Sequence, residues 1–194
     1  MALHERRHGD VLDFARYWYL GEILDGRAPR TTIIKGAQRG LSVACILRCI
    51  EDQLHLGLRG SGYFFPTDRE VSDFSKARFD PILAQYGLAA RVNTTEIKEI
   101  GDGYVWFRAA GPRGGGQKSL SATKSFPADK LYLDEYDEMA PSRVDSIRHR
   151  LDGADPDVRE EIGLSTPTIP EYGVHYDYQR SAQRVLMQRC GKCG

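Results

Sequence analysis

The sequence has no apolar run that approaches the roughly 18 residues needed for a membrane-spanning helix. Its first ten residues, MALHERRHGD, are too charged for a secretory signal. It also has no excess of either charge, because 27 Lys and Arg residues are balanced by 27 Asp and Glu residues. Overall charge therefore gives no argument for nucleic-acid binding, which leaves only local patches. We expect no membrane partner.

Cysteine is scarce, with four residues in two pairs. Cys45 and Cys49 are four residues apart in an expected helix, where cysteine usually serves as a small buried apolar residue. Cys190 and Cys193 form a C-x-x-C pair, and no helix can follow Cys193 to lower a thiol pKa, which argues against a redox role. Nothing indicates a secreted disulfide framework, so we expect a reducing compartment.

The pattern of apolar residues predicts helices alternating with strands in a single globular domain. We expect helices at 10–24 (capped by Asp10), about 42–55, 67–87 (with a Thr67–Glu70 capping box) and 142–151, short buried strands within 31–34, 61–67, 130–135 and 160–166, and a hairpin with an Asp-Gly turn within 94–110. This order is typical of an α/β sandwich with a mainly parallel sheet flanked by helices.

Three polar segments follow expected strands of this sheet: KGAQRGLS (35–42), DEYDE (134–138) and STPT (165–168). In parallel α/β sheets, ligands bind beyond the carboxyl ends of the strands. We therefore expect the three segments to converge on one site. The glycine-rich loop GPRGGGQKS lacks the strand before it and the helix after it that a phosphate-binding loop requires.

The first segment is a displaced version of the phosphate-binding pattern G-x-x-x-x-G-K-[ST]. Gly40 and Ser42 match the pattern, but Lys35 occupies the first position and Leu41 replaces the usual lysine. Because both ends of such a loop converge on the phosphates, Lys35 can supply the missing charge. Gly36 and Gly40 allow backbone N–H groups to approach phosphate closely at the start of a helix.

We expect Ser42 to hold Mg²⁺ and Arg39 to add positive charge at the γ-phosphate. The alternative is a plain strand–turn–helix joint in which Lys35 and Arg39 are exposed on the surface. The other two segments must decide between these interpretations.

The acidic segment supplies the carboxylates that an ATPase of this kind needs. Asp134 is positioned to hold Mg²⁺ through water, and Glu135 to polarise the attacking water. We interpret Asp137 and Glu138 as capping residues at a helix N-terminus. Ser165, Thr166 and Thr168 can hydrogen-bond either to a γ-phosphate or to the acidic pair, although Ser-Thr-Pro is also common in turns.

Taken in order, KGAQRGLS, YFFPTDREVSDFSKARFDPIL, LYLDEYDEM and LSTPTIPEYGVHYDYQRSAQR…CGKCG resemble the ATPase half of a phage terminase large subunit. The lambda-like branch, whose loop also begins with its lysine, is most similar. The resemblance runs from about residue 10 to the end of the chain. It implies a P-loop NTPase fold (ASCE/RecA-like) and an ATP hydrolase that packages double-stranded DNA into a procapsid.

The resemblance also assigns residues. Lys35, Gly36, Gln38, Gly40, Leu41 and Ser42 form the nucleotide-binding loop, Asp134 and Glu135 are the Walker B pair, and Ser165-Thr166-Pro167 is the coupling motif. Ala182 departs from the acidic residue usual in the SAQR stretch, and Arg39 is not typical of its position. Implied cofactors are ATP and Mg²⁺. Implied partners are double-stranded DNA, a terminase small subunit, a portal and other copies of the chain in a ring, in the host cytoplasm and transiently at the procapsid.

The resemblance divides the chain into an N-terminal helical segment (1–30), an ATPase core (31–180) and the start of a truncated zinc-ribbon-like segment (181–194). Cys190 and Cys193 supply two ligands where structural zinc takes four, and His175 has no partner at finger-like spacing. We therefore expect zinc only in a longer chain. Nuclease activity is likewise expected only in a C-terminal domain that this chain lacks, which suggests a fragment or a truncated product.

Two other functions are compatible with the sequence. One is a helicase-like or other P-loop ATPase that acts on nucleic acid outside packaging. The other is a non-hydrolysing binding module whose loop has decayed, which measurable Mg²⁺-dependent ATP turnover would exclude.

Overall fold

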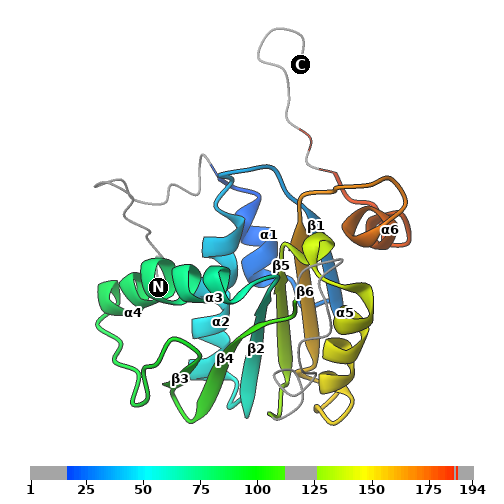
Figure 1. Cartoon of the computed structure of the whole chain (residues 1–194). Helices are drawn as coiled ribbons and strands as arrows, with labels where there is room; N and C mark the ends of the chain where they lie inside the picture. Colours follow the sequence, from blue (N-terminus) through cyan, green and yellow to red (C-terminus); the bar gives the residue numbers. More distant parts are fainter. Residues whose placement is uncertain (1–16, 112–125, 186, 188–194) are drawn as a thin grey trace, which may run out of the picture.

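The structure is a computed structural model that describes residues 17–111, 126–185 and 187 of the chain (Figure 1). Its strands are β1 (Arg30–Ile34), β2 (Gly60–Phe65), β3 (Ile97–Ile100), β4 (Gly103–Ala109), β5 (Lys130–Asp134) and β6 (Glu160–Ser165). Its α-helices are α1 (Leu20–Asp25), α2 (Leu41–His55), α3 (Asp68–Phe74), α4 (Asp80–Gln85), α5 (Pro141–Arg148) and α6 (Gly173–Gln179). Within these described ranges, no helix has the length and apolar character required to cross a membrane.

The six strands form one sheet in the order β1-β6-β5-β2-β4-β3. All neighbouring pairs are parallel except β3 and β4, which form the expected antiparallel hairpin. The prediction of a mainly parallel sheet flanked by helices is therefore confirmed. β6 lies between β1 and β5 in the sheet. The strand before the loop that begins at Lys35 (β1) and the strand that ends at Asp134 (β5) therefore share β6 as a neighbour.

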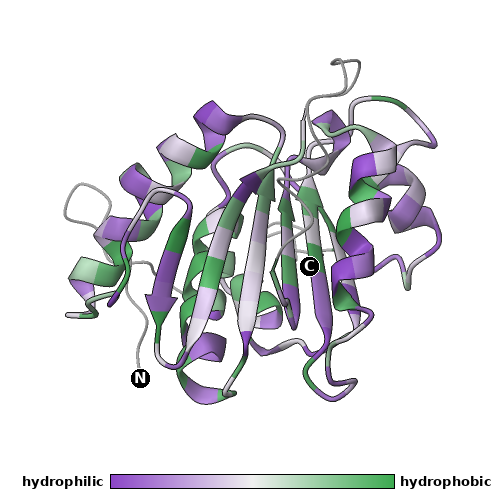
Figure 2. Ribbon diagram, turned by 60° about the horizontal axis from the view of Figure 1, so that its bottom comes forward, coloured by the Kyte–Doolittle hydropathy of each residue, from purple (hydrophilic) through white to green (hydrophobic). Residues whose placement is uncertain are grey.

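Helices cover both faces of the sheet, and the central strands send alternate side chains to each face (Figure 1). Tyr63 and Phe65 of β2 pack with α1, α2, α3 and α4, whereas Phe64 packs with α5 and α6 in a second cluster. Figure 2 shows green residues recurring along the central strands, while purple residues gather in loops and on outer helix faces. Cys45 and Cys49 are fully buried in the first cluster, as expected of small apolar residues.

Local sequence signals account for several element boundaries. The capping box is present, because Thr67 Oγ1 accepts a hydrogen bond from the Glu70 N–H (3.3 Å) and the Thr67 N–H donates to Glu70 Oε2 (2.9 Å). The helical region that follows is nearly continuous, with a π-helical segment, Ser75–Phe79, joining α3 to α4. Pro66 ends β2, as expected.

Three details differ from the sequence predictions. The hairpin turn is centred on Gly101 and Asp102, not on Asp102 and Gly103, because Ile100 pairs with Gly103. Of the two central residues, only Gly101 has a positive φ angle (61°). β1 is only partly buried, since it lies at the sheet edge. The helix α6 was not predicted. Of the helix expected over 10–24, residues 10–16 and the Asp10 cap lie outside the described residues.

Candidate active site

The three polar segments meet at one edge of the sheet. The parallel register aligns Ile34 with Ser165 and Asp134 with Leu164. Just beyond the strands, the Lys35 N–H donates to the Ser165 carbonyl (3.0 Å) and the Glu135 N–H donates to the Leu164 carbonyl (2.8 Å). β1, β5 and β6 therefore end together, and the expected convergence of the three segments is confirmed.

Lys35, which follows β1, reaches the acidic pair at the end of β5. Its Nζ atom is 2.5 Å from Asp134 Oδ1 and 2.8 Å from Glu135 Oε1. The Lys35 side chain is only 11% exposed, so it is not the surface residue of the alternative interpretation. Arg39, by contrast, is exposed. Of the two basic side chains in the loop, Lys35 is the one that the structure brings to the acidic pair.

The lysine is charged in this environment. Burial acts to lower its pKa, but the neighbouring carboxylates of Asp134 and Glu135 outweigh burial and hold the pKa above its ordinary value of 10.5. The ammonium group therefore persists throughout the neutral range. A nucleotide phosphate would meet a fixed positive charge at this position.

Ser42, near the start of α2, completes the cluster. Its Oγ atom donates a hydrogen bond to Asp134 Oδ2 (3.0 Å). A hydroxyl oxygen and a carboxylate oxygen at this separation are hard donors of the kind that Mg²⁺ prefers. Within the described residues, no three or more His, Cys, Asp and Glu side chains gather as a metal site. Mg²⁺ here would take one carboxylate from the protein and its other ligands from Ser42, phosphate and water, which is its usual mode of binding.

The loop backbone between Lys35 and α2 contains two residues in the left-handed region. Gln38 and Gly40 both have positive φ angles (57° and 76°), so the chain turns sharply before α2 begins. A Cβ atom at Gly36 would meet only the Arg39 side chain, at 3.8 Å, which leaves that backbone open to a ligand. The Leu41 side chain packs into the core, so this residue offers a ligand only its backbone.

A contact that the sequence did not reveal supports the loop from outside. The Tyr19 hydroxyl donates to the Arg39 carbonyl (2.8 Å), which connects the segment before α1 to the loop. No sequence signal links these positions, because the two residues belong to separate local patterns.

Glu135 is held in an uncommon backbone conformation by the neighbouring strand end. Its φ and ψ angles are 56° and 40°, in the left-handed region that non-glycine residues rarely adopt. Its Oε2 atom accepts hydrogen bonds from Ser165 Oγ (3.3 Å) and the Thr166 N–H (3.2 Å). The sequence left two partners open for these hydroxyls, a γ-phosphate or the acidic pair. The Ser165 hydroxyl contacts Glu135 of the acidic pair, whereas Thr166 Oγ1 donates to the Lys35 carbonyl (3.3 Å).

Neither Asp137 nor Glu138 caps α5, the helix that follows them in the chain, whereas Asp137 caps the distant helix α6. The residue before α5 is Ala140, which makes no side-chain cap. Asp137 is instead fully buried and accepts a hydrogen bond from the N–H of Val174, near the start of α6 (2.6 Å). Glu138 is exposed. Sequence reasoning missed this because α6 begins 35 positions after Glu138.

Cys45, Cys49 and His175 make no hydrogen bond or ion pair with this cluster in the described part of the chain. Burial raises the pKa of the Cys49 thiol to about 12, which disfavours the reactive thiolate. His175 Nδ1 accepts a hydrogen bond from the Glu171 N–H (2.8 Å). Cys190 and Cys193, the predicted zinc half-site, lie outside the described residues.

The cluster can bind an anion and a divalent cation side by side. A partly buried ammonium group, a hydroxyl and two carboxylates lie at the carboxyl edge of a parallel sheet, beside a sharp loop and the positive end of a helix. Together with the sheet order, this arrangement is that of a P-loop-like α/β fold, in which ligands bind at the carboxyl edge of the sheet.

Solved structures of phage packaging proteins have the same fold. The chain is similar to the large terminase from a thermophilic bacteriophage, in one crystal form (TM-score 0.56) and in a complex with ADP (TM-score 0.58), and to the Phi-28 gp11 DNA packaging motor (TM-score 0.53). Sequence identity is 12% in each comparison, and 83–85% of this chain is covered. The fold is therefore terminase-like.

The similarity does not extend to sequence or to whole proteins. No family model matches the sequence, and no curated protein matches it either. The chain spans 41% and 42% of the two thermophilic-phage terminase chains and 56% of the Phi-28 gp11 chain.

Proposed function

We propose that this chain is the ATP-hydrolysing region of a motor that packages double-stranded DNA, similar to a phage terminase large subunit. One observation carries the proposal: Lys35 and Ser42 from one side of the site and Asp134 and Glu135 from the other are in direct contact at the carboxyl edge of the sheet. The terminase-like fold and the ADP complex of a similar protein support it.

Each side chain has a role that fits its position. Lys35 binds the β- and γ-phosphate oxygens as a charge-assisted donor, in place of the lysine that usually precedes the serine. Backbone N–H groups of the loop around Gly36 and Gly40 bind the remaining phosphate oxygens. Arg39, exposed at the loop, adds positive charge near the γ-phosphate.

Asp134 and Ser42 would hold Mg²⁺, which would neutralise phosphate charge when bound. Glu135 accepts the proton of the attacking water as a general base. For that reaction its carboxylate must be free of Lys35, so we propose that phosphate binding draws the lysine away from Glu135. Ser165 and Thr166 keep the other carboxylate oxygen in place.

The biological setting is also part of the proposal. We propose membership of the lambda-like branch on the basis of the lysine at the first loop position. The motor would act as a ring of copies on double-stranded DNA, with a small subunit and a portal, in the host cytoplasm and at the procapsid. Zinc binding by Cys190 and Cys193 would need about two further ligands.

A helicase-like ATPase remains the second candidate, because the same cluster would serve any nucleic-acid-dependent motor. The test is ATP turnover by residues 1–194 with Mg²⁺, alone and with linear double-stranded or single-stranded DNA. We expect Mg²⁺-dependent turnover that double-stranded DNA stimulates. Stimulation by single-stranded DNA alone would favour the helicase-like function, and absence of both binding and turnover would contradict the proposal.

A further inference from the structure

The carboxylate of Asp137 connects the site to α6. Asp137 is fully buried, and its Oδ1 atom accepts a hydrogen bond from the Val174 N–H (2.6 Å). Its Oδ2 atom accepts from both the N–H and the hydroxyl of Thr168 (3.0 and 3.2 Å). These three donors compensate for burying a charge and fix the start of α6 to the segment that follows β5.

The backbone of the same residue faces the acidic pair. The Asp137 N–H donates to Ser165 Oγ (3.2 Å), and the Ser165 hydroxyl donates in turn to Glu135 Oε2 (3.3 Å). Asp137 therefore lies two hydrogen bonds from the carboxylate of Glu135. Only one residue, Tyr136, separates them along the chain.

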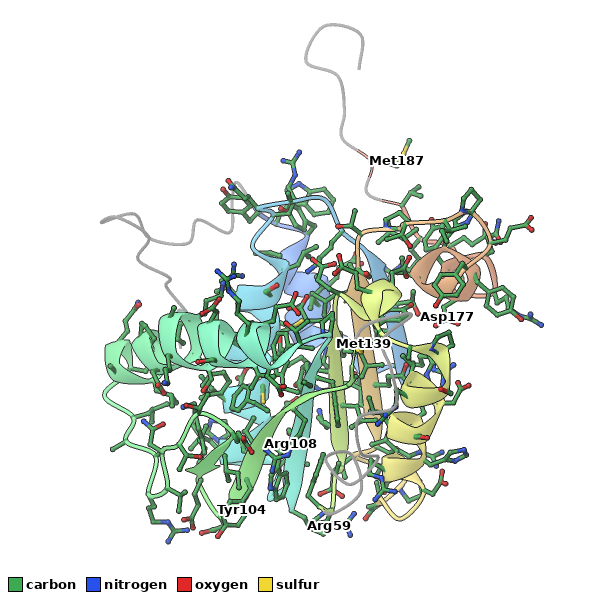
Figure 3. The ribbon with its side chains drawn as sticks, in the orientation of Figure 1. Arg59, Tyr104, Arg108, Met139, Asp177 and Met187 are labelled. Carbon is green, nitrogen blue, oxygen red and sulfur yellow. The ribbon has the colours of Figure 1, made fainter. Side chains whose placement is uncertain are left out.

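Tyr136 makes a second, parallel connection. Its hydroxyl donates to Asp177 Oδ2 on α6 (3.2 Å), an oxygen that also accepts from Arg148 Nη2 of α5 (2.8 Å). Its ring covers Gly163 of β6 so closely that a Cβ atom there would lie 2.8 Å from the ring. Figure 3 shows Asp177 on α6, on the side towards α5. The two residues after Glu135 thus hold α6 at two points.

The contact at the start of α6 depends on a glycine. Gly173 has a φ angle of 51°, and a Cβ atom on it would lie 2.1 Å from Asp137 Oδ1. Any side chain at this position would displace the carboxylate. Gly173 therefore offers a way to disturb the contact without removing a charge.

We propose that Asp137 is a positioning residue that couples the state of Glu135 to the position of α6. The inference rests on the proposed function, since nucleotide is the ligand that would separate Lys35 from Glu135. Glu135 would then adjust within its contacts to Ser165 and Thr166, and the Ser165–Asp137 hydrogen bond would pass the shift to α6. A competing route exists, because α6 also packs beside β1, the strand that leads to Lys35.

The test compares hydrogen–deuterium exchange of the α6 amides with and without ADP and Mg²⁺. We compare wild type with the variants Asp137→Asn and Gly173→Ala and with the control Glu138→Gln. The β3–β4 hairpin, at the other end of the strand order from β1, serves as internal reference. The control makes the same isosteric change at the exposed neighbouring carboxylate. In wild type and control, we expect nucleotide to change the exchange rate of α6 relative to the hairpin by at least about fivefold.

In Asp137→Asn and Gly173→Ala, most of that nucleotide-dependent change should be lost, with the remainder carried by the Tyr136–Asp177 contact, while the affinity for ADP stays within about fivefold of wild type. A purely structural contact would raise basal exchange at Val174 without altering its response to nucleotide. We also expect kcat for ATP to fall about tenfold with KM changed less than about twofold. Should either variant not fold, Tyr136→Phe tests the parallel connection, where we expect a reduced response.

The outcomes separate the two proposals. If wild type binds nucleotide but α6 does not respond, or if the response survives undiminished in both Asp137→Asn and Gly173→Ala, the coupling through Asp137 is wrong and the proposed function stands. If wild type binds neither ADP nor ATP, the proposed function fails and the coupling with it.

Discussion

The ammonium nitrogen of Lys35 lies 2.5 Å from Oδ1 of Asp134, although 99 positions separate the two residues in the chain. The same ammonium is 2.8 Å from Oε1 of Glu135. The positive charge that would bind phosphate is thus already paired with the carboxylates that would hold Mg²⁺ and activate water. Under the proposed function, nucleotide binding would exchange these ion pairs for contacts with phosphate.

This arrangement predicts different consequences for the two carboxylates. Glu135→Gln should retain binding of ATP and Mg²⁺ but slow hydrolysis by about 10²–10⁴-fold, because the general base is lost. Asp134→Asn should instead weaken the dependence of nucleotide binding on Mg²⁺, since Ser42 Oγ would have lost its carboxylate neighbour. Titration of ATP against each variant at several Mg²⁺ concentrations, with single-turnover rates, measures both effects. Equal losses of ATP affinity would contradict this division of roles.

A second prediction concerns a buried ion cluster at the amino-terminal ends of β5 and β6, on the side of the sheet away from the candidate site. Lys130 Nζ lies 2.5 Å from Asp52 Oδ2 and 3.0 Å from Glu160 Oε2, and Arg48 Nη2 lies 2.6 Å from Glu160. All four side chains are at most 4% exposed. Lys130→Met would leave a net negative charge buried, so we expect a loss of about 3–5 kcal/mol in the free energy of unfolding.

Urea denaturation followed by circular dichroism measures that loss. Arg69→Ala is the matched control, because its ion pair with Asp73 is exposed, with side chains 90% and 71% accessible. We expect no measurable change in the control. A loss below about 1 kcal/mol in Lys130→Met would show that the cluster does not carry the stability assigned to it.

A third prediction is that residues 1–194 neither hold stoichiometric zinc nor cut DNA. Cys190 and Cys193 supply two thiolates where structural zinc takes about four ligands. Two-metal nucleases need several carboxylates around ions about 3.5–4 Å apart, whereas the one dense acidic cluster in the sequence, 134–138, is assigned to the ATP site and to the anchoring of α6. Elemental analysis of protein purified without chelator, and plasmid nicking with Mg²⁺ or Mn²⁺, check both parts. One zinc per chain, or nicking that disappears in an Asp134 variant, would refute it.

The sequence predicted features that depend on local chemistry or on the general geometry of parallel sheets. The Thr67–Glu70 capping box, the hairpin and the helix after Gly40 follow from residues a few positions apart. The meeting of Lys35 with the acidic pair follows from the rule that parallel strands end at one edge, even across 99 positions.

Features that depend on unrelated segments could not be predicted in this way. α6 has only seven residues and begins with a glycine, so its pattern is too short to distinguish from a turn. The helix that Asp137 caps could not be identified, because its hydrogen-bond donors, Thr168 and Val174, belong to a segment more than 30 positions away. The contact between Tyr19 and Arg39 has no local signature either.

The central claim is that Lys35 replaces the usual loop lysine, and nucleotide affinity tests it most directly. Isothermal titration of ADP and Mg²⁺ compares wild type with Lys35→Ala and with Arg39→Ala, a loop control whose exposed side chain makes no contact with the acidic pair. Lys35→Ala should lose a charge-assisted contact of about 1.5–3 kcal/mol, or at least about tenfold in affinity, and Arg39→Ala should lose less. Because the pKa of Lys35 is held above 10.5, the difference between wild type and Lys35→Ala should stay constant from about pH 7.5 to 9.5 and diminish only at still higher pH. Wild-type affinity in Lys35→Ala would contradict the claim.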